Sequence, residues 1–324
     1  MTRLCDHTMT SHTPDAARSH WSRNRTYAIA VLVTATAIWG STFAVVDYVV
    51  QHVQVHTFLS IRFTIAVVLL LAIRPRALRG VTRRTWTQGL LVGFALGVGY
   101  YLQTQGQALG TQPTIAAFIT GLFVVITPLL AALLFKARIG TVTWVAIGTA
   151  TIGLAALTLR SGKVDTGALF LVGCAAAFAV QIVLLSRWST ASTTVSLVAI
   201  QLLVVAVGEN FAALAVHGIP TGSDFDFNSR TWLAIGFLAV FATVLCYLVQ
   251  TWAQSLIPAT AAAVILTAEP MFASITGAAM RETVTAVQIV GAALVLTAMY
   301  LVELAPRRAG GRESEEASLP HLEP

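Results

Sequence analysis

One polar pattern occurs twice in this chain: residues 100–107 read YYLQTQGQ, and residues 247–254 read YLVQTWAQ. Tyr247 follows Tyr100 by 147 residues, and at this spacing Tyr, Gln, Thr and Gln recur at four matching positions. These positions are i, i+3, i+4 and i+7, which lie on one face of an α-helix. Both rows stand inside long apolar stretches, so the chain carries two copies of a helix with one polar face.

The composition of the whole chain excludes several classes of protein. Of the 324 residues, 56% are hydrophobic and only 10% are charged, whereas a soluble domain carries about 25% charged residues. A soluble enzyme, a disordered chain and a disulfide scaffold are therefore excluded. The net charge of +6 comes from basic residues beside apolar stretches, which indicates membrane orientation and not nucleic-acid binding. We predict a polytopic helical protein in a lipid bilayer.

Ten apolar stretches are long enough to cross a bilayer, which takes about 20 helical residues. They are 27–50, 55–73, 86–109, 112–135, 141–159, 166–186, 193–216, 231–254, 258–280 and 283–303. Helices are expected because a segment in lipid must satisfy its own backbone hydrogen bonds. The predicted fold class is therefore all-α, with ten transmembrane helices.

The repeated row divides the ten helices into two halves. We expect a first five-helix repeat over residues 27–160 and a second over residues 161–303, with tails at 1–26 and 304–324. Because five is an odd number, the second repeat enters the membrane from the opposite side. Inverted repeats of this kind are a frequent transporter design, with the site near the midplane between the halves. The charged C-terminal tail is expected to be disordered.

The distribution of basic residues predicts the orientation. If the N-terminus is cytoplasmic, fifteen of the 20 Lys and Arg residues fall in cytoplasmic segments and four in outer loops, while Arg62 lies inside the second span. Such a bias is the positive-inside signal. Both termini are therefore expected on the cytoplasmic side of a cell membrane (inner or plasma), and the first apolar stretch is expected to be an uncleaved helix.

The two polar rows are the first candidate site. They consist of Tyr100, Gln103, Thr104 and Gln107, and of Tyr247, Gln250, Thr251 and Gln254. An amide that faced lipid would lose several kcal/mol of hydration, so the rows must face protein or a hydrated cavity. We interpret them as the lining of a substrate pathway, with interhelical hydrogen bonding as the alternative. Their positions leave open whether they share one pocket or line opposite vestibules.

Four charged residues within the spans are candidates for coupling or for structural pairing. Glu269 lies mid-span before Pro270 and is either a proton-coupling or cation-binding carboxylate, or a neutral Glu bonded to a neighbouring helix. Arg62 is expected to form an ion pair with Asp47, and contact with an anionic substrate group is the alternative. Glu209 is a second possible partner of Arg62, or a residue of the outer vestibule.

Trp39 lies mid-span in the sequence WGSTF of residues 39–43. Its ring is expected either to form an aromatic wall of the pathway or to pack with its indole N–H satisfied. The neighbouring glycine permits a second helix to come close.

Taken in chain order, these motifs resemble the EamA family of the drug/metabolite transporter superfamily, whose members are ten-helix carriers. The matching segments are WGSTF at 39–43, Arg62-Phe63, FITGL at 118–122 with Pro128, GAL at 167–169, Glu269-Pro270 and Arg281-Glu282. The resemblance covers residues 27–303. It departs in the loop after the fourth span, which reads KARI at 136–139 where family members often carry an acidic residue like Glu282.

The resemblance implies an inner-membrane carrier that works by alternating access and often exports amino acids, other metabolites or drugs. It also places Phe118 of the FITGL motif among the residues expected along the pathway. The cavity is expected between spans one, three, four, six, eight and nine.

The sequence therefore predicts a secondary transporter that exports a small metabolite, an amino acid or a drug-like solute. An uptake carrier is the alternative of the same class, and a non-transporting receptor or scaffold is the alternative of a different class. The sequence shows no phosphate-binding loop, no metal-ligand cluster and no nucleophile–base pair within a span, so we expect no cofactor, no metal and no enzymatic activity. The expected partners are a small-molecule substrate and the lipid bilayer, and nucleic acid is not expected.

Overall fold

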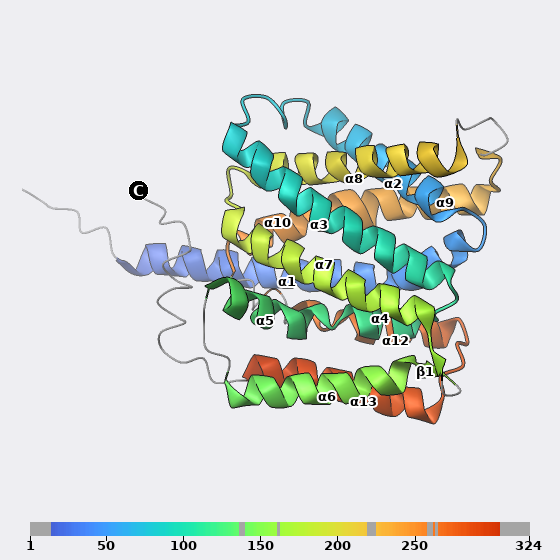
Figure 1. The fold of residues 1–324 in the computed structure, drawn as a ribbon. Helices are drawn as coiled ribbons and strands as arrows, with labels where there is room; N and C mark the ends of the chain where they lie inside the picture. The colour runs from blue at the N-terminus through green and yellow to red at the C-terminus, as the bar shows by residue number, and fades with distance from the viewer. Residues whose placement is uncertain are drawn as a thin grey trace, which may run out of the picture.

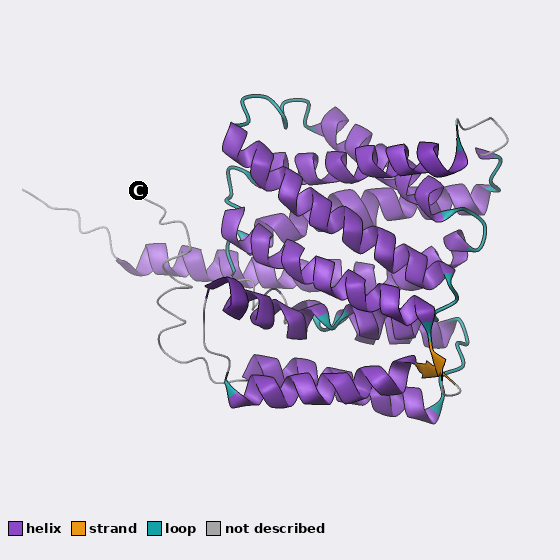
Figure 2. Ribbon diagram, in the orientation of Figure 1, coloured by secondary structure: helices purple, strands orange, loops and turns teal. Residues whose placement is uncertain are grey.

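The structure is a computed structural model that describes residues 14–135, 140–160, 163–218, 225–257, 262 and 265–304. This part of the chain is helical except for short connections and one two-stranded hairpin (Figure 2). The helices lie side by side in one bundle (Figure 1). The disorder expected for the C-terminal tail and the departure at 136–139 concern residues outside the described ranges, apart from residue 304.

The first half of the chain supplies the helices that lead up to the hairpin. They are α1 (Pro14–Val50), α2 (Val55–Ile73), α3 (Arg83–Ala108), α4 (Pro113–Thr120), α5 (Phe123–Phe135) and α6 (Thr141–Thr158). Helix α1 begins at Pro14, so the described part of the predicted N-terminal tail continues the first helix.

The second half begins at the hairpin of β1 (Leu159–Arg160) and β2 (Lys163–Val164), which pair antiparallel. Its helices are α7 (Thr166–Trp188), α8 (Thr194–His217), α9 (Ser229–Phe237), the π-helix η2 (Leu238–Leu245), α10 (Cys246–Gln254), α12 (Glu269–Ala279) and α13 (Ala286–Leu304). Helices α9, η2 and α10 follow one another without a break and occupy the predicted eighth span.

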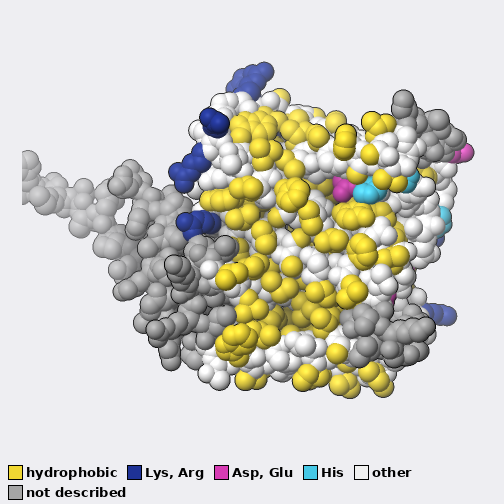
Figure 3. Space-filling model, in the orientation of Figure 1, with side chains coloured by type: hydrophobic (Ala, Val, Ile, Leu, Met, Phe, Trp, Pro, Cys, Tyr) yellow, Lys and Arg dark blue, Asp and Glu magenta, His cyan; other side chains and the backbone are white. Residues whose placement is uncertain are grey.

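Within the described residues, five helical segments are long and apolar enough to cross a membrane. They are Thr26–Val50, Val55–Ile73, Thr166–Trp188, Thr194–His217 and Ser229–Gln254. Large hydrophobic side chains also cover the outside of the bundle (Figure 3). Phe94, Phe211 and Leu233 are among the exposed ones. Such an apolar exterior suits a lipid environment, because a soluble surface of this kind would aggregate. The predicted all-helical character is confirmed.

The fourth predicted span, 112–135, is interrupted, because the helix divides into α4 and α5 at Gly121 and Leu122. The backbone tightens there, with Leu122 N–H donating to Ile119 O and Val124 N–H donating to Gly121 O. A Cβ at Gly121 would lie 3.1 Å from Met299 Cε and 3.2 Å from a Pro270 ring atom. Glycine therefore lets α12 and α13 approach the break closely.

The described part of the ninth span is also interrupted. Residues 265–266 are helical, residues 267–268 form a turn, and α12 begins at Glu269 with Pro270 in its first turn. Proline suits that position, because it has no N–H to leave unbonded at a helix start. Both halves thus carry a broken helix, and 147 residues separate Thr120 at the first break from Thr267 at the second.

Helices α1 and α7, the first helix of each half, run in opposite directions through the bundle (Figure 1). Helix α1 starts, and α13 ends, at one side of the molecule, while β1 and the start of α7 lie at the other (Figure 1). We call these the termini side and the hairpin side. Lys and Arg side chains gather at the termini-side edge (Figure 3).

Contacts between the halves come in matching pairs. Helix α1 contacts α10 and α12 of the second half, and α7 contacts α3 and α5 of the first half. Helix α2 packs on α8, and α6 packs on α13. Helices α1 and α7 therefore occupy corresponding places, because each contacts two helices of the other half.

Candidate functional site

A cavity lies between the two halves and is lined by residues of both. Eight of the residues predicted for the pathway or for intramembrane charge line it: Trp39, Arg62, Tyr100, Gln103, Gln107, Tyr247, Gln250 and Glu269. The rest of the lining consists of Thr42, Phe43, Val46, Phe123, Phe178, Gln181, Ile182 and Leu266. The two polar rows thus meet in one cavity instead of lining separate vestibules.

The two repeated tyrosines join the halves at the cavity. Tyr247 donates its hydroxyl hydrogen to Tyr100 Oη at 3.0 Å. Each ring also contacts an aromatic ring from the first helix of the other half: Trp39 lies 5.4 Å from Tyr247, and Phe178 lies 5.6 Å from Tyr100, between ring centroids. Trp39 and Phe178 stand 139 residues apart, so the two contacts are equivalent under exchange of the halves.

Arg62 is buried, with 2% of its surface exposed. Its Nε donates to Thr243 Oγ1 at 2.9 Å, its Nη2 donates to Tyr100 Oη at 3.3 Å, and its Cζ lies 4.7 Å from the centre of the Tyr100 ring. These contacts hold the guanidinium group in the cavity wall. The aromatic face and the two hydroxyl oxygens stabilise a cation there.

The predicted ion pair between Arg62 and Asp47 is wrong. Asp47 accepts a hydrogen bond of 2.9 Å from Gln51 Nε2 on its own helix, and no carboxylate among the described residues lies within 4.0 Å of Arg62. Arg62 faces α3 and η2, whereas Asp47 is near the end of α1. Depth alone did not determine which faces of the helices meet.

The π-helix η2 shapes one wall of the site. Its wider turns leave backbone carbonyls free to accept bonds from outside the helix. Ala242 O accepts from Trp39 Nε1 at 2.8 Å, and Thr243 Oγ1 donates to Leu238 O at 2.9 Å. Both expectations for Trp39 are therefore met, because its indole N–H is satisfied and its ring lines the cavity.

Glu269 enters the cavity because α12 starts there. Gly40 of α1 makes this possible: a Cβ at residue 40 would lie 2.5 Å from Glu269 O and 2.6 Å from Phe272 Cβ. The Glu269 side chain is 8% exposed, and within the described residues no hydrogen bond or ion pair holds its carboxyl group. A carboxyl group in this position is available to a proton, a cation or a basic group of a ligand.

The other predicted site residues lie outside the cavity lining. Thr104, Thr251 and Phe118 are buried between helices. Gln254 Nε2 donates to Ser186 Oγ at 2.8 Å and to Ile182 O at 3.4 Å. Gln254 therefore forms the interhelical bonds of the alternative interpretation, whereas the Oγ1 atoms of Thr104 and Thr251 are buried without a hydrogen-bond partner in the described chain.

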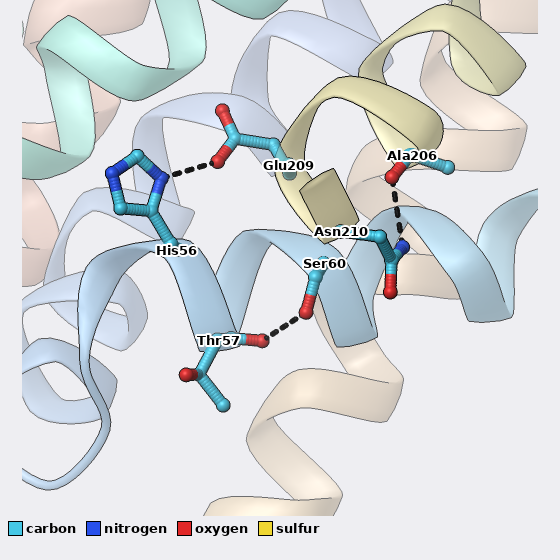
Figure 4. A network of polar contacts seen from close by, with 6 residues as sticks. All are labelled: His56, Thr57, Ser60, Ala206, Glu209 and Asn210. Atoms are coloured by element: carbon cyan, nitrogen blue, oxygen red, sulfur yellow. Dashed lines mark hydrogen bonds and ion pairs between the residues drawn. The ribbon is translucent and has the colours of Figure 1, made fainter. Parts of the chain in front are cut away.

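Glu209 belongs to a separate contact between the halves. His56 Nδ1 of α2 lies 2.8 Å from Glu209 Oε2 of α8, and the two side chains point toward each other (Figure 4). Tyr101 stacks on the His56 ring at 4.9 Å between centroids. The proposed pairing of Glu209 with Arg62 is therefore wrong, and His56 takes that place.

The sequence profile of the EamA-like transporter family matches this chain twice, over residues 26–159 and residues 165–304. The chain belongs to the EamA-like transporter family.

A relative of this EamA-like chain in Archaeoglobus fulgidus, named "Uncharacterized transporter", is 31% identical over 281 residues, which are 86% of this chain and 87% of the relative. A solved crystal structure of a protein has the same fold, with a TM-score of 0.60 at 18% identity, covering 86% of this chain and 97% of the other. Family and apolar helices together identify a multi-pass membrane transporter, and a transporter acts on a small-molecule substrate.

The EamA-like cavity also contains residues that the sequence patterns did not single out. Gln181 accepts from Gln250 Nε2 at 3.5 Å and donates to Gln201 Oε1 at 3.4 Å. Gln181 is an amide in the middle of an apolar span, so the burial argument applied to the two rows was able to find it. Thr243 extends the second polar row by one turn, but the row did not indicate Arg62 as its partner. His56 gave no comparable signal, because its partner depends on how the helices rotate.

Proposed function

We propose that this transporter carries a small solute across the membrane by alternating access, with export as its direction. The observation that supports this best is the cavity between the halves, to which the two polar rows contribute equivalent tyrosine and glutamine side chains. A site between the halves near the midplane is typical of carriers built from inverted repeats.

The architecture that we propose is ten transmembrane helices in two inverted five-helix repeats, over residues 27–160 and 161–303, in an inner or plasma membrane with cytoplasmic termini. Three observations support it: the family profile matches each half, the first helices of the two halves run in opposite directions (Figure 1), and the contacts between the halves come in pairs. The basic residues at the termini side support the orientation.

The proposed pathway residues are those of the cavity and of the rows around it. The proposed residues that line the cavity are Trp39, Tyr100, Gln103, Gln107, Tyr247 and Gln250. The proposed residues that are buried behind this lining are Thr104, Phe118, Thr251 and Gln254. Arg62 would bind an anionic group of the solute, because it is a fixed cation with no carboxylate of the described residues within 4.0 Å. Glu269 would bind a proton or a cation.

Counterflow into liposomes tests the proposal. Purified protein would be reconstituted with unlabelled metabolites inside, and uptake of the labelled compound would be followed for a library of small anions, amino acids and amphipathic solutes. We expect at least one compound to accumulate transiently, and Gln103→Leu or Gln250→Leu to abolish that accumulation. Gln51→Leu, which removes an exposed amide near the end of α1, is the matched control and should retain it.

Two results would favour the alternatives. Binding of a compound without counterflow would support a receptor or scaffold. Net flux toward the termini side under physiological gradients would support uptake in place of export.

A further inference from the structure

The last glutamine of each polar row forms an equivalent bond. Gln107 Nε2 donates to Phe43 O at 3.1 Å, and Gln254 Nε2 donates to Ile182 O at 3.4 Å. Gln254 follows Gln107 by 147 residues, and Ile182 follows Phe43 by 139 residues. These are the spacings that relate Tyr100 to Tyr247 and Trp39 to Phe178, so the two bonds correspond under exchange of the halves.

The two bonds lie at opposite ends of the cavity. Each glutamine is seven residues beyond the tyrosine of its row, which is about 10 Å along a helix. Helix α3 runs toward the hairpin side and α10 runs toward the termini side (Figure 1). The bond from Gln107 therefore joins α3 to α1 on the hairpin side, and the bond from Gln254 joins α10 to α7 on the termini side.

Each bond gives a partner to the Nε2 atom of its glutamine but none to the Oε1 atom. The Oε1 atoms of Gln107 and Gln254 are buried without a hydrogen-bond partner in the described chain, and so are the Oγ1 atoms of Thr104 and Thr251 one turn earlier. Buried, unpaired oxygens carry a desolvation penalty that water would remove. When either end of the cavity opens and becomes wet, the lost amide bond is thus offset by hydration of two oxygen atoms.

We propose that these two amides are latches, one at each end of the cavity, that open alternately. Gln107 closes the hairpin side by holding α3 against α1, and Gln254 closes the termini side by holding α10 against α7. The second bond of Gln254, to Ser186 Oγ at 2.8 Å, has no counterpart on the hairpin side, where Asp47 occupies the equivalent position and is bonded to Gln51. The termini-side latch is therefore the stronger one.

The inference rests on the proposed function, but its test needs no substrate. Thr42 lines the cavity, and Thr42→Cys in a Cys5→Ser background provides a reporter, with the same chain lacking the reporter as the blank. A charged, membrane-impermeant thiol reagent would be applied to right-side-out and to inside-out vesicles. The rate of labelling then measures access to the cavity from each side.

We expect Gln107→Leu to raise labelling from the hairpin side alone, and Gln254→Leu to raise it from the termini side alone. The increase should be about threefold to tenfold, as for the loss of one hydrogen bond between helices. Gln105→Leu on α3, at a half-buried position outside the cavity lining, and Ser255→Ala at the end of α10, whose hydroxyl donates to Trp252 O of the same helix, are the controls and should change neither rate. Gln107→Asn and Gln254→Asn, which keep an amide but shorten it, should act in the same direction if the leucine variants do not fold.

Equal labelling from both sides, or no change in either variant, would overturn the latches. Counterflow of a solute by the same preparations separates this failure from that of the proposed function. Sided labelling without any solute flux would keep the latches and reject transport, whereas flux without a sided effect would keep transport and reject the latches.

Discussion

Arg62 holds a positive charge inside the bundle with aromatic rings and hydroxyl groups around it. Its Cζ lies 5.9 Å from the Phe58 ring, 5.6 Å from the Phe63 ring and 4.7 Å from the Tyr100 ring. Cation–π contacts and two hydrogen bonds stabilise the charge without neutralising it. A solute that brings an anionic group into the cavity would complete this arrangement.

Arg62→Gln is therefore expected to raise the KM for an anionic solute by about tenfold to a hundredfold, because charge-assisted hydrogen bonds contribute about 1.5–3 kcal/mol. Arg62→Lys should give an intermediate value, because it keeps the charge but not the planar group. Initial rates of counterflow measure both. Arg230→Gln, at an exposed arginine over the Tyr48 ring, is the control, and an unchanged KM in Arg62→Gln would contradict the assignment.

Glu269→Gln tests the carboxyl group at the start of α12. If that group carries the coupling proton, the glutamine variant should still exchange solute but should no longer respond to a pH gradient across the liposome. Glu209→Gln removes the carboxylate that contacts His56 outside the cavity, and it should keep the response. Accumulation driven by pH in Glu269→Gln would dismiss the coupling role.

At this scale the sequence predicted which residues reach the cavity better than it predicted their partners. The spacing of Tyr100, Gln103 and Gln107 fixes a common helix face, and that face does meet the cavity. The partner of Arg62 depended on Thr243, whose position follows from the extra residue in the turn of η2. Apolar periodicity does not reveal a π-helix, so this contact was beyond the sequence.

The helices themselves were mostly predictable, because apolar length and polar breaks set their limits. The interruptions of the fourth and ninth spans were not predictable, although both spans contain residues that explain the interruption once the structure is known. Gly121 allows a close approach that only the folded neighbours make necessary. A break of this kind depends on both of the helices that meet, so it cannot be predicted from the local sequence of either one.

Gly40 provides a test of the close contact between α1 and α12. Gly40→Ala should lower the melting temperature in detergent and the transport rate together, because its Cβ meets a backbone oxygen at 2.5 Å and overpacking costs about 1–3 kcal/mol. Gly148→Ala is the matched control on α6, with no atom within 4 Å of the added carbon. It should be neutral or gain about 0.5–1 kcal/mol, and equal melting of both variants would refute the close contact.

The whole molecule makes a prediction about topology. A fluorescent protein fused after residue 324 should fold and fluoresce in the cytoplasm, and an accessible tag inserted between residues 160 and 163 should be reached by antibody from outside intact cells. The reason is that the termini side carries most of the basic residues. The reversed result would invert the orientation, and labelling of both positions from one side would refute the inverted repeats.

The duplication was visible in the sequence at this largest scale, since the four repeated positions of each row are recognisable at a fixed spacing. What the sequence did not show is that the first helices of the halves follow a different spacing, 139 in place of 147. That difference emerged only from the contacts of Trp39 and Phe178 with the two tyrosines.

The bond between Tyr100 and Tyr247 has a consequence for the symmetry of the carrier. Two identical hydroxyls that face each other across a twofold axis cannot both donate, so one proton must break the equivalence. In the structure Tyr247 is the donor of this pair, and Tyr100 Oη accepts from Arg62 Nη2 as well. The repeat-equivalent residue in α8, at the spacing of 139, is the uncharged Gln201. The nearly symmetric bundle is therefore polar, and the two ends of its cavity differ chemically even without a solute.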